Sequence, residues 1–354
     1  MEVKILKYRE AEQLWRNFNA FQYRLLVQHT WAWQRMLHNW EGLEWSSIAL
    51  LEKNQIIAAI PFCVKTVDNI GKVLMSSPLP ASYGGVLHIT NINIEIVYKT
   101  LLLELLKFAE INKIDIISIF TSPFRDDIDY YRKYLQPDYI TEKFYQYLNK
   151  DILNTKLHGK IKNNINRSLN KRSINKCYLQ WSTKEQDLYE WYNEVLKKRF
   201  ADKGIEPVEY NFFKSMFNEL LPEGLIELSF IRDFDGNMIT GGLFLYGWCQ
   251  DIFLRASNDK GIEYNLGLGY DYDMLLHAFS KGIDICNFQS SPSKLDSSYM
   301  YKKHFCCIEK DNYYICKIFN KDIFKKIKDI DEIKKAFPYF YIIPFEKFNE
   351  VKAL

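Results

Sequence analysis

The stretch from Leu225 to Phe305 constrains the fold of this chain more than any other part. It opens with apolar runs separated by turn residues such as Gly and Asn, which tolerate a positive φ, so it predicts consecutive antiparallel strands. A glycine-bearing loop, a helix with apolar periodicity and one more apolar run follow. The predicted strands are Leu225–Arg232, Ile239–Tyr246, Ile252–Ala256 and Ile283–Phe288, and the helix ends at about Lys281. This order of elements indicates an α/β fold.

The loop before this helix contains a Gly-x-Gly pair. Because glycine has no Cβ, the backbone can approach an anion closely, and the first N–H groups and the dipole of the helix point at that anion. The pattern predicts a phosphate-binding loop, and an ordinary tight turn is the alternative interpretation. The candidate binding residues are Asn265, Leu266, Gly267, Leu268 and Gly269.

A second stretch of the chain repeats this order of elements. The segment from Ile114 to Pro123 aligns with the segment from Ile283 to Pro292, and both follow a helix and a lysine and end in Ser-Pro. The elements before Ile114, including a predicted helix at Ile94–Ile111, have the same order too. We therefore interpret the chain as an internal duplication with one α/β unit in each half. The Gly-x-Gly loop is present only in the second copy, where we expect the chemistry.

Length and composition agree with two globular domains and a tail. The 354 residues are 47% hydrophobic and 26% charged, and the net charge of +3 does not indicate a nucleic-acid-binding protein as a whole. We expect domains at residues 1–150 and 151–320, and a helical, aromatic tail at 321–354 that packs on the body. The chain has no apolar run near the roughly 18 residues that a membrane span needs. Its first residues are charged where a signal peptide is apolar, so we expect a cytoplasmic protein.

Cysteine and histidine usage gives no sign of a disulfide framework or a metal centre. The seven cysteines are odd in number and form no Cys-x-x-Cys pair, which is typical of small buried side chains in a reducing compartment. The six histidines are dispersed along the chain. We therefore expect no metal site.

The segment between the two halves is strongly basic. From Ile152 to Thr183 there is no acidic residue, and the apolar positions Ile161, Ile165 and Leu169 have helical spacing. This pattern predicts an amphipathic helix that either joins two domains with a solvated face or binds a phosphate-bearing partner. Such a partner would be a nucleotide-linked donor, an RNA acceptor stem or an anionic lipid headgroup. The cations are Lys156, Lys160, Lys162, Arg167, Lys171, Arg172 and Lys176.

The order of elements resembles the core of the GNAT acyltransferases, whose pyrophosphate loop reads Gln/Arg-x-x-Gly-x-Gly/Ala. Gly267 and Gly269 match this pattern, whereas Tyr264 stands at its first position. Two such units in one chain resemble the FemAB-type transferases and the BioF2-like or CelD-like acetyltransferases. A signature of that superfamily, Tyr-x-Phe-Lys-Lys-Gly-Phe, resembles the segment from Tyr299 to Phe305, although His304 replaces the glycine.

Two further segments resemble the same superfamily. The basic helix from Lys160 to Arg167 resembles its Arg-rich helix at the start of the second domain, and Trp191–Gly204 resembles its following helix and Arg-x-Gly turn. The chain lacks the long coiled-coil insertion of some Fem ligases. The resemblance implies an α/β fold of two tandem GNAT-like domains, each a mixed, largely antiparallel twisted sheet flanked by helices.

The resemblance also implies an activity. An amine would attack an activated acyl carbon, with acetyl-CoA or another acyl-CoA as co-substrate and an amino sugar or similar precursor of a cell-envelope polysaccharide as acceptor. The acceptor would be a small molecule or linked to a lipid or nucleotide, which leaves room for peripheral membrane contact but not for DNA. One alternative is a Fem-like transferase that uses aminoacyl-tRNA on a peptidoglycan precursor. Another is a non-catalytic GNAT scaffold that binds a glycan precursor.

The resemblance assigns roles to individual residues. Lys302 matches the family lysine, so we expect it to be a catalytic or phosphate-contacting cation, and Tyr299 and Tyr301 are candidates for protonation of the leaving thiolate. Acidic side chains on the strands would relay a proton from the amine. The acidic candidates are Asp251 and Asp284, and the candidates for acceptor binding are Arg167, Arg199, Arg255, Ser290 and Ser291.

Overall fold

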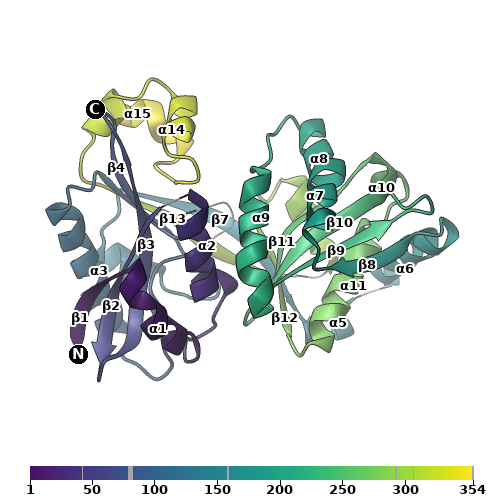
Figure 1. Ribbon diagram of the computed structural model, residues 1–354, viewed down its shortest axis with the longest axis horizontal. Coiled ribbons are helices and arrows are strands. Elements are labelled where there is room, and N and C mark those ends of the chain that lie inside the picture. The colour runs from purple at the N-terminus through teal and green to yellow at the C-terminus, as the bar shows by residue number, and fades with distance from the viewer. Residues whose placement is uncertain (42, 79–82, 158, 292, 306, 353–354) are drawn as a thin grey trace. The chain divides into compact units, whose positions relative to one another are not determined.

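The computed structural model describes residues 1–354 except 42, 79–82, 158, 292, 306 and 353–354 (Figure 1). Predictions that involve Pro80, Ala81, Ser82, His158, Pro292 and Cys306 therefore lie outside the described residues. The chain divides into two compact units. Unit 1 comprises Met1–Lys143 and Asp311–Leu354, and unit 2 comprises Phe144–Lys310. The predicted domain limits at 150 and 320 stay a prediction.

Unit 1 consists of a sheet, four helices of its first segment and a helical tail. Its strands are β1 (Glu2–Lys7), β2 (Glu44–Glu52), β3 (Gln55–Val67), β4 (Gly71–Ser76), β5 (Leu87–His88), β6 (Ile116–Phe120) and most of β13 (Ile308–Ile318). Its helices are α1 (Tyr8–Asn19), α2 (Trp31–Glu41), α3 (Ile94–Ile111) and α4 (Ile128–Tyr134), with a 3-10 turn η1 (Val27–His29). The tail holds α13 (Asp322–Lys325), α14 (Ile330–Ala336), η5 (Phe345–Lys347) and α15 (Phe348–Lys352).

The sheet of unit 1 has the order β1-β2-β3-β4-β6-β13, and among its described strand pairs only β4–β6 is parallel. Helix α3 packs on one face, where its leucines join a core with Ile48 and Ile60. On the other face Trp45 contacts Trp15 of α1 and Trp31 of α2, with ring centroids 5.4 and 5.5 Å away. These three tryptophans are therefore part of the core of unit 1.

The segment before the tail differs from the prediction. The sequence pattern predicts a two-stranded hairpin around Asp311-Asn312, and this prediction is wrong. The described part forms one strand, β13, which pairs with β6 from Tyr314–Phe120 to Ile318–Ile116. Asn312 is fully buried in this strand, so tertiary packing overrides its turn propensity.

The tail that follows β13 packs on the body of unit 1. The carbonyl of Tyr341 accepts a hydrogen bond from the hydroxyl of Ser118 on β6. The ring of Tyr341 stacks on that of Tyr314, with the two centroids 4.5 Å apart. The tail is therefore attached to both β6 and β13.

Unit 2 consists of a second sheet with helices on both faces. Its strands are the end of β7 (Tyr139–Asn149), β8 (Tyr178–Ser182), β9 (Ile226–Arg232), β10 (Met238–Tyr246), β11 (Gln250–Ser257) and β12 (Ile285–Ser291). Its helices are α5 (Lys150–Lys156), α6 (Gly159–Ile174), α7 (Glu185–Glu190), α8 (Lys197–Asp202), α9 (Tyr210–Leu220), α10 (Asp259–Glu263), α11 (Gly267–Ser280) and α12 (Ser297–Lys302). A π-helical turn η2 (Trp191–Leu196) connects α7 to α8, and 3-10 turns are η3 (Leu221–Glu223) and η4 (Lys303–Phe305).

The sheet of unit 2 has the order β7-β12-β11-β10-β9-β8, and of the strand pairs in its described part only β11–β12 is parallel. Alternate residues point to opposite faces, so Phe244 contacts Tyr270 of α11, whereas Phe253 contacts Phe212 of α9. Helices α6 and α11 thus cover one face, and η2 and α9 cover the other (Figure 1).

The two units repeat one order of elements. In unit 1 this order is β2-β3-β4-α3-β6, and in unit 2 it is β9-β10-β11-α11-β12. Each set contains two antiparallel pairs followed by one parallel pair, so the predicted duplication is confirmed at the level of the fold. None of the helices in the described residues is long and apolar enough to cross a membrane.

Candidate functional site

A cavity of about 560 Å³ opens in unit 2 where β11 and β12 diverge. The described residues of these strands pair only at Gln250–Cys286 and Asp251–Asn287. Beyond that point Gln289 adopts a positive φ of 63°, and the register of β12 on β7 shifts. The corresponding strands of unit 1 pair at four positions. Strands that separate in this way leave backbone polar groups for a ligand.

One wall of the cavity carries a cluster of the buried Asp271 with the half-buried Arg255 and Tyr301. The Nε of Arg255 lies 2.9 Å from Oδ1 of Asp271, and the Tyr301 hydroxyl donates to Oδ2 at 2.6 Å. Burial raises the pKa of Asp271, although Arg255 and Tyr301 act in the opposite direction. Burial also raises the pKa of Tyr301 well above its usual value, so the phenol keeps its proton.

Lys302 lies at the end of the splayed strand β12. Helix α12 begins at the cap Asp296, which accepts from the Ser298 N–H at 2.7 Å, and the helix directs Lys302 into unit 2. The ammonium donates to the carbonyls of Gln289 and Ser290 at 2.9 and 3.2 Å and to the hydroxyl of Ser291 at 2.9 Å. Burial lowers its pKa to about 8. All three ammonium donors are therefore used to hold the end of β12.

The two glycines of the predicted phosphate loop have different surroundings. A Cβ on Gly267 would point toward the cavity and meet Arg255 Nη1 at 3.3 Å and Tyr301 Oη at 3.5 Å. A Cβ on Gly269 would instead meet Ser168 Oγ of α6 at 2.9 Å. The same hydroxyl accepts from the Gly269 N–H at 3.0 Å and donates to the Asn265 carbonyl at 2.6 Å. Helix α6 thus caps part of the α11 N-terminus from outside.

The cavity is rich in positive charge. Arg199 and Lys203, from the end of α8 and the residue after it, line it together with Arg255 and Lys302. Among the described residues that line the cavity, Asp271 is the only acidic one. This balance suits a substrate that carries phosphate groups.

The structure brings some of the predicted site residues together and places others elsewhere. Those that line the cavity are Lys302, Tyr301, Arg255, Arg199, Asn265, Leu266 and Gly267. Those outside the lining are Tyr299, Asp251, Asp284, Arg167, Leu268, Gly269, Ser290 and Ser291.

The residues outside the lining have identifiable contacts. Tyr299 is buried and donates to Glu309. Asp251 accepts from Gln289 Nε2 at 3.2 Å, so it lies one residue removed from the cavity. Asp284 is exposed before β12, and Arg167 is exposed on α6.

Four residues of the site were missed by sequence reasoning. Asp271 lies one turn into α11, and an acidic residue in an otherwise apolar helix just after Gly-x-Gly is a signal that could have identified it. Ser168, Lys203 and Gln289 reach the site only through tertiary contacts, for which the sequence carries no local signal.

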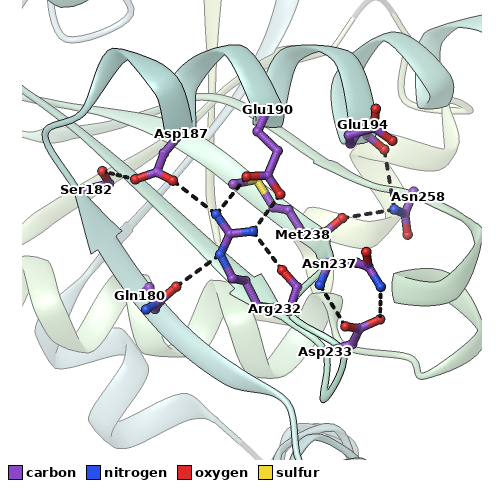
Figure 2. A network of polar contacts seen from close by, with 11 residues as sticks. Gln180, Ser182, Asp187, Glu190, Glu194, Arg232, Asp233, Asn237, Met238 and Asn258 are labelled. Atoms are coloured by element: carbon purple, nitrogen blue, oxygen red, sulfur yellow. Dashed lines mark hydrogen bonds and ion pairs between the residues drawn. The ribbon is translucent and has the colours of Figure 1, made fainter.

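A separate polar network joins β8, α7 and β9 on another side of unit 2 (Figure 2). Arg232 donates to both carboxylate oxygens of Glu190 at 2.5 and 2.8 Å and to Asp187 at 3.0 Å. Its Nε also donates to Gln180 at 3.2 Å. Since the guanidinium is satisfied within the unit, we interpret this network as structural.

Comparisons with known proteins establish the fold and not the activity. No family model matches the chain, and no curated protein matches it. Among solved structures, FemX is 12% identical with a TM-score of 0.67, and the match covers 92% of this chain and 99% of that one.

Two further solved structures are also similar. L-PGS from Bacillus licheniformis is 11% identical with a TM-score of 0.51, covering 83% of this chain and 89% of that one. A tandem GNAT protein from the clavulanic acid biosynthesis pathway is 8% identical with a TM-score of 0.54, covering 90% and 98%. The chain therefore has the fold of two GNAT-like domains in tandem, as the sequence predicts, and the more specific BioF2-like or CelD-like resemblance stays a prediction.

Proposed function

We propose that the protein is an N-acyltransferase that moves an acyl group to an amine in the cavity of unit 2. The observation that carries this proposal is the divergence of β11 from β12, which opens a cationic cavity beside the first turn of a helix. The first donor to consider is acetyl-CoA or another acyl-CoA. We place the reaction in the cytoplasm and its acceptor among amino sugars or other amine precursors of cell-envelope polysaccharide.

The residues present fit an acyl-CoA in part. The open edges of β11 and β12 suit an extended chain with amide groups, such as the pantetheine arm. Gly267 lines the cavity at the first turn of α11, and a helix N-terminus suits a phosphate. The amide of Gly269 is occupied by Ser168, so fewer donors remain for the pyrophosphate than the loop pattern implies.

The chemistry would proceed by attack of the neutral amine on the acyl carbonyl. The C–N bond forms first and the carbonyl oxygen gains negative charge; the C–S bond then breaks, and the departing thiolate gains a proton to replace the one that the nitrogen loses. The donors of Lys302 hold the end of β12, so it would act on the negative charge through its fixed positive charge. Tyr301 is the candidate for protonation of the thiolate, and its hydroxyl, which donates to Asp271 Oδ2, would have to turn to the sulfur for this step. Asp251 would act on the site through Gln289. Arg199 would bind a phosphate-bearing acceptor that is linked to a nucleotide or lipid.

A second donor, aminoacyl-tRNA, is favoured by two observations. Ser168 occupies part of the α11 N-terminus, and the exposed face of α6 carries Lys160 and Arg167 without an acidic residue between Ile152 and Thr183. A basic face of this kind binds nucleic-acid backbones without reading their sequence. In this case the acceptor would be a peptidoglycan precursor. A third reading, a non-catalytic scaffold that binds a glycan precursor, predicts binding without turnover.

The experiment that tests the proposal combines two assays. The full chain is incubated with acetyl-CoA and a panel of amino sugars, and the release of free CoA is measured. Binding of uncharged tRNA is measured in parallel at 50 and 200 mM salt. Acceptor-dependent CoA release supports the first donor, and no release with any acyl-CoA rejects it. Strong, salt-sensitive tRNA binding together with no CoA release favours the second donor.

A further inference from the structure

Unit 1 contains a cavity of about 450 Å³ at the place that corresponds to the cavity of unit 2. It lies beside the first turn of α3, which is the counterpart of α11, and beside the segment after β6, which is the counterpart of β12. The lining includes the rings of Tyr23, His88, Phe124 and Tyr130. A cavity therefore persists in the copy that lacks the Gly-x-Gly loop.

One arginine of this cavity, Arg125, lacks a carboxylate partner such as the one that Arg255 has in the cavity of unit 2. Arg125 lines the cavity and is 9% exposed. Its Nη2 donates to the carbonyl of Tyr23 at 2.9 Å, and its Nη1 has no hydrogen-bond partner. In the part of the chain that the structure describes, no carboxylate forms an ion pair with it. In unit 2, by contrast, Arg255 is paired with Asp271 at 2.9 Å.

Two carboxylates, of Asp126 and Asp127, line this cavity of unit 1, and that of Asp127 is already engaged. Asp127 accepts from the Tyr98 hydroxyl at 2.5 Å, and both residues line the cavity. Among the described residues Arg125 has, besides the Tyr23 carbonyl, the Tyr23 ring at 5.9 Å from its Cζ and a longer-range attraction to Asp127. A buried guanidinium with one neutral hydrogen-bond acceptor is costly, because the lost hydration of the charge is not fully replaced. An oxyanion from outside the chain would replace it, since a guanidinium fork matches the geometry of carboxylate and phosphate.

We propose that unit 1 has a second binding site for a small organic anion, whose phosphate or carboxylate group contacts Arg125 and whose body packs on Tyr23, His88 and Tyr130. Two of these rings are already nearly parallel: Tyr23 and His88 stack with their centroids 5.7 Å apart and an angle of 11° between the ring planes. A planar or ring-shaped ligand continues such a stack. The site is independent of the acyl-transfer cavity in unit 2.

The local backbone agrees with a built site. Arg24 and Asn91 line the cavity and have positive φ angles of 53° and 58°. This conformation is disfavoured for arginine in particular and persists where the surroundings require it, often at ligand sites. The guanidinium of Arg24 is also held over the Tyr23 ring at 4.8 Å. The strained turn thus places a second cation at the same ring.

The test uses three probes that share a ring, namely phenyl phosphate, benzoate and benzyl alcohol. Each is titrated into the full chain at constant ionic strength, and heat and stoichiometry are recorded. We expect saturable binding of at least one anion and none of the neutral alcohol, and the tighter anion identifies phosphate or carboxylate as the group. Arg125→Gln should remove one saturable site or weaken it at least tenfold.

Matched variants keep the test decisive. Arg132→Gln alters an exposed arginine of α4 that pairs with Asp129 at 2.9 Å, and it should leave anion binding unchanged. Without ligand, Arg125→Gln should unfold at the same or a higher temperature, because it removes a buried charge that has no carboxylate partner. The proposal is overturned if the natural chain binds neither anion saturably, if both variants weaken binding equally, or if Arg125→Gln clearly lowers the Tm.

Discussion

The two units place a tyrosine–aspartate bond at the same point of the repeated fold, with the partners exchanged. In unit 1 the fifth residue of α3, Tyr98, donates to Asp127 after β6. In unit 2 the fifth residue of α11 is Asp271, which accepts from Tyr301 after β12. A bond between this helix and the segment after the next strand is therefore common to both copies.

The difference lies in what surrounds this bond. In unit 2 the strands diverge after two pairs, and the carboxylate also binds Arg255. In unit 1 the parallel strands pair at four positions, and the carboxylate binds no arginine within ion-pair distance among the described residues. In unit 2, Arg255 therefore has an ion-pair partner and strands β11 and β12 separate early. In unit 1, strands β4 and β6 stay paired over four positions.

The largest expected effect is the loss of a buried ion pair in unit 2. Asp271→Asn leaves the half-buried Arg255 without its carboxylate, so the free energy of unfolding should fall by about 3 kcal/mol. Asp127→Asn in unit 1 should cost at most about 1 kcal/mol at pH 7, because the amide oxygen still accepts from Tyr98. Denaturant unfolding of both variants measures this contrast, and equal losses would contradict it.

The second effect concerns Lys302 of unit 2, which holds the end of β12. Lys302→Met removes the buried ammonium that holds the end of β12, and we expect kcat/KM to fall by about 100-fold or more. The neighbouring Lys303→Met removes an exposed lysine that lies 3.6 Å from Glu309, so it should change kcat/KM less than about threefold. Initial rates of CoA release compare them, and similar rates for the two variants would remove Lys302 from the site.

The third effect is a difference between Gly267 and Gly269 of the loop in what an added methyl group would contact. Gly269→Ala places a methyl group 2.9 Å from Ser168 Oγ and 3.0 Å from the Leu169 side chain, so unfolding should become easier by about 2–3 kcal/mol. Gly267→Ala meets only the ends of flexible side chains and should cost less than about 1 kcal/mol while raising KM for the donor. Thermal unfolding and donor titration are the measurements. An unchanged KM in Gly267→Ala would argue against a donor at this helix terminus.

The smallest effect is a pH dependence of unit 1. Burial raises the pKa of Asp127 to about 6, against the opposing effects of Tyr98 and Arg125, while the exposed Asp126 adds a small rise. The folded chain then keeps a proton that the unfolded chain has released, so stability falls as pH rises from about 4 to 6 and is level above that. Relative to Asp127→Asn, the fall should be about 2 kcal/mol. Denaturant titrations at pH 4.5 and 7 measure this loss of stability, and a stability that rises with pH would contradict the raised pKa of Asp127.

Local patterns were sufficient for most of the elements but not for the site. The helix Ile94–Ile111 was predicted with its observed bounds, because its leucine periodicity and its Asn93 cap are both local. The hairpin at Asp311 failed because burial decided the conformation there. A motif drew attention to Lys302 and Tyr301, which line the cavity and whose roles stay a prediction, whereas Ser168 was missed because it meets Gly269 from 101 positions away.

The Ser168 bond makes the position of α6 and the state of the α11 N-terminus one equilibrium. Any ligand group that takes the Gly269 N–H must displace a hydroxyl that α6 supplies, and thereby loosens the attachment of α6 to the Asn265 carbonyl. A polyanion on the basic face of α6 would free that N–H for a donor only if it bound the displaced position of α6 more tightly. Because such coupling is reciprocal, the two binding events would then strengthen each other by the same factor, with Ser168 Oγ as their shared contact.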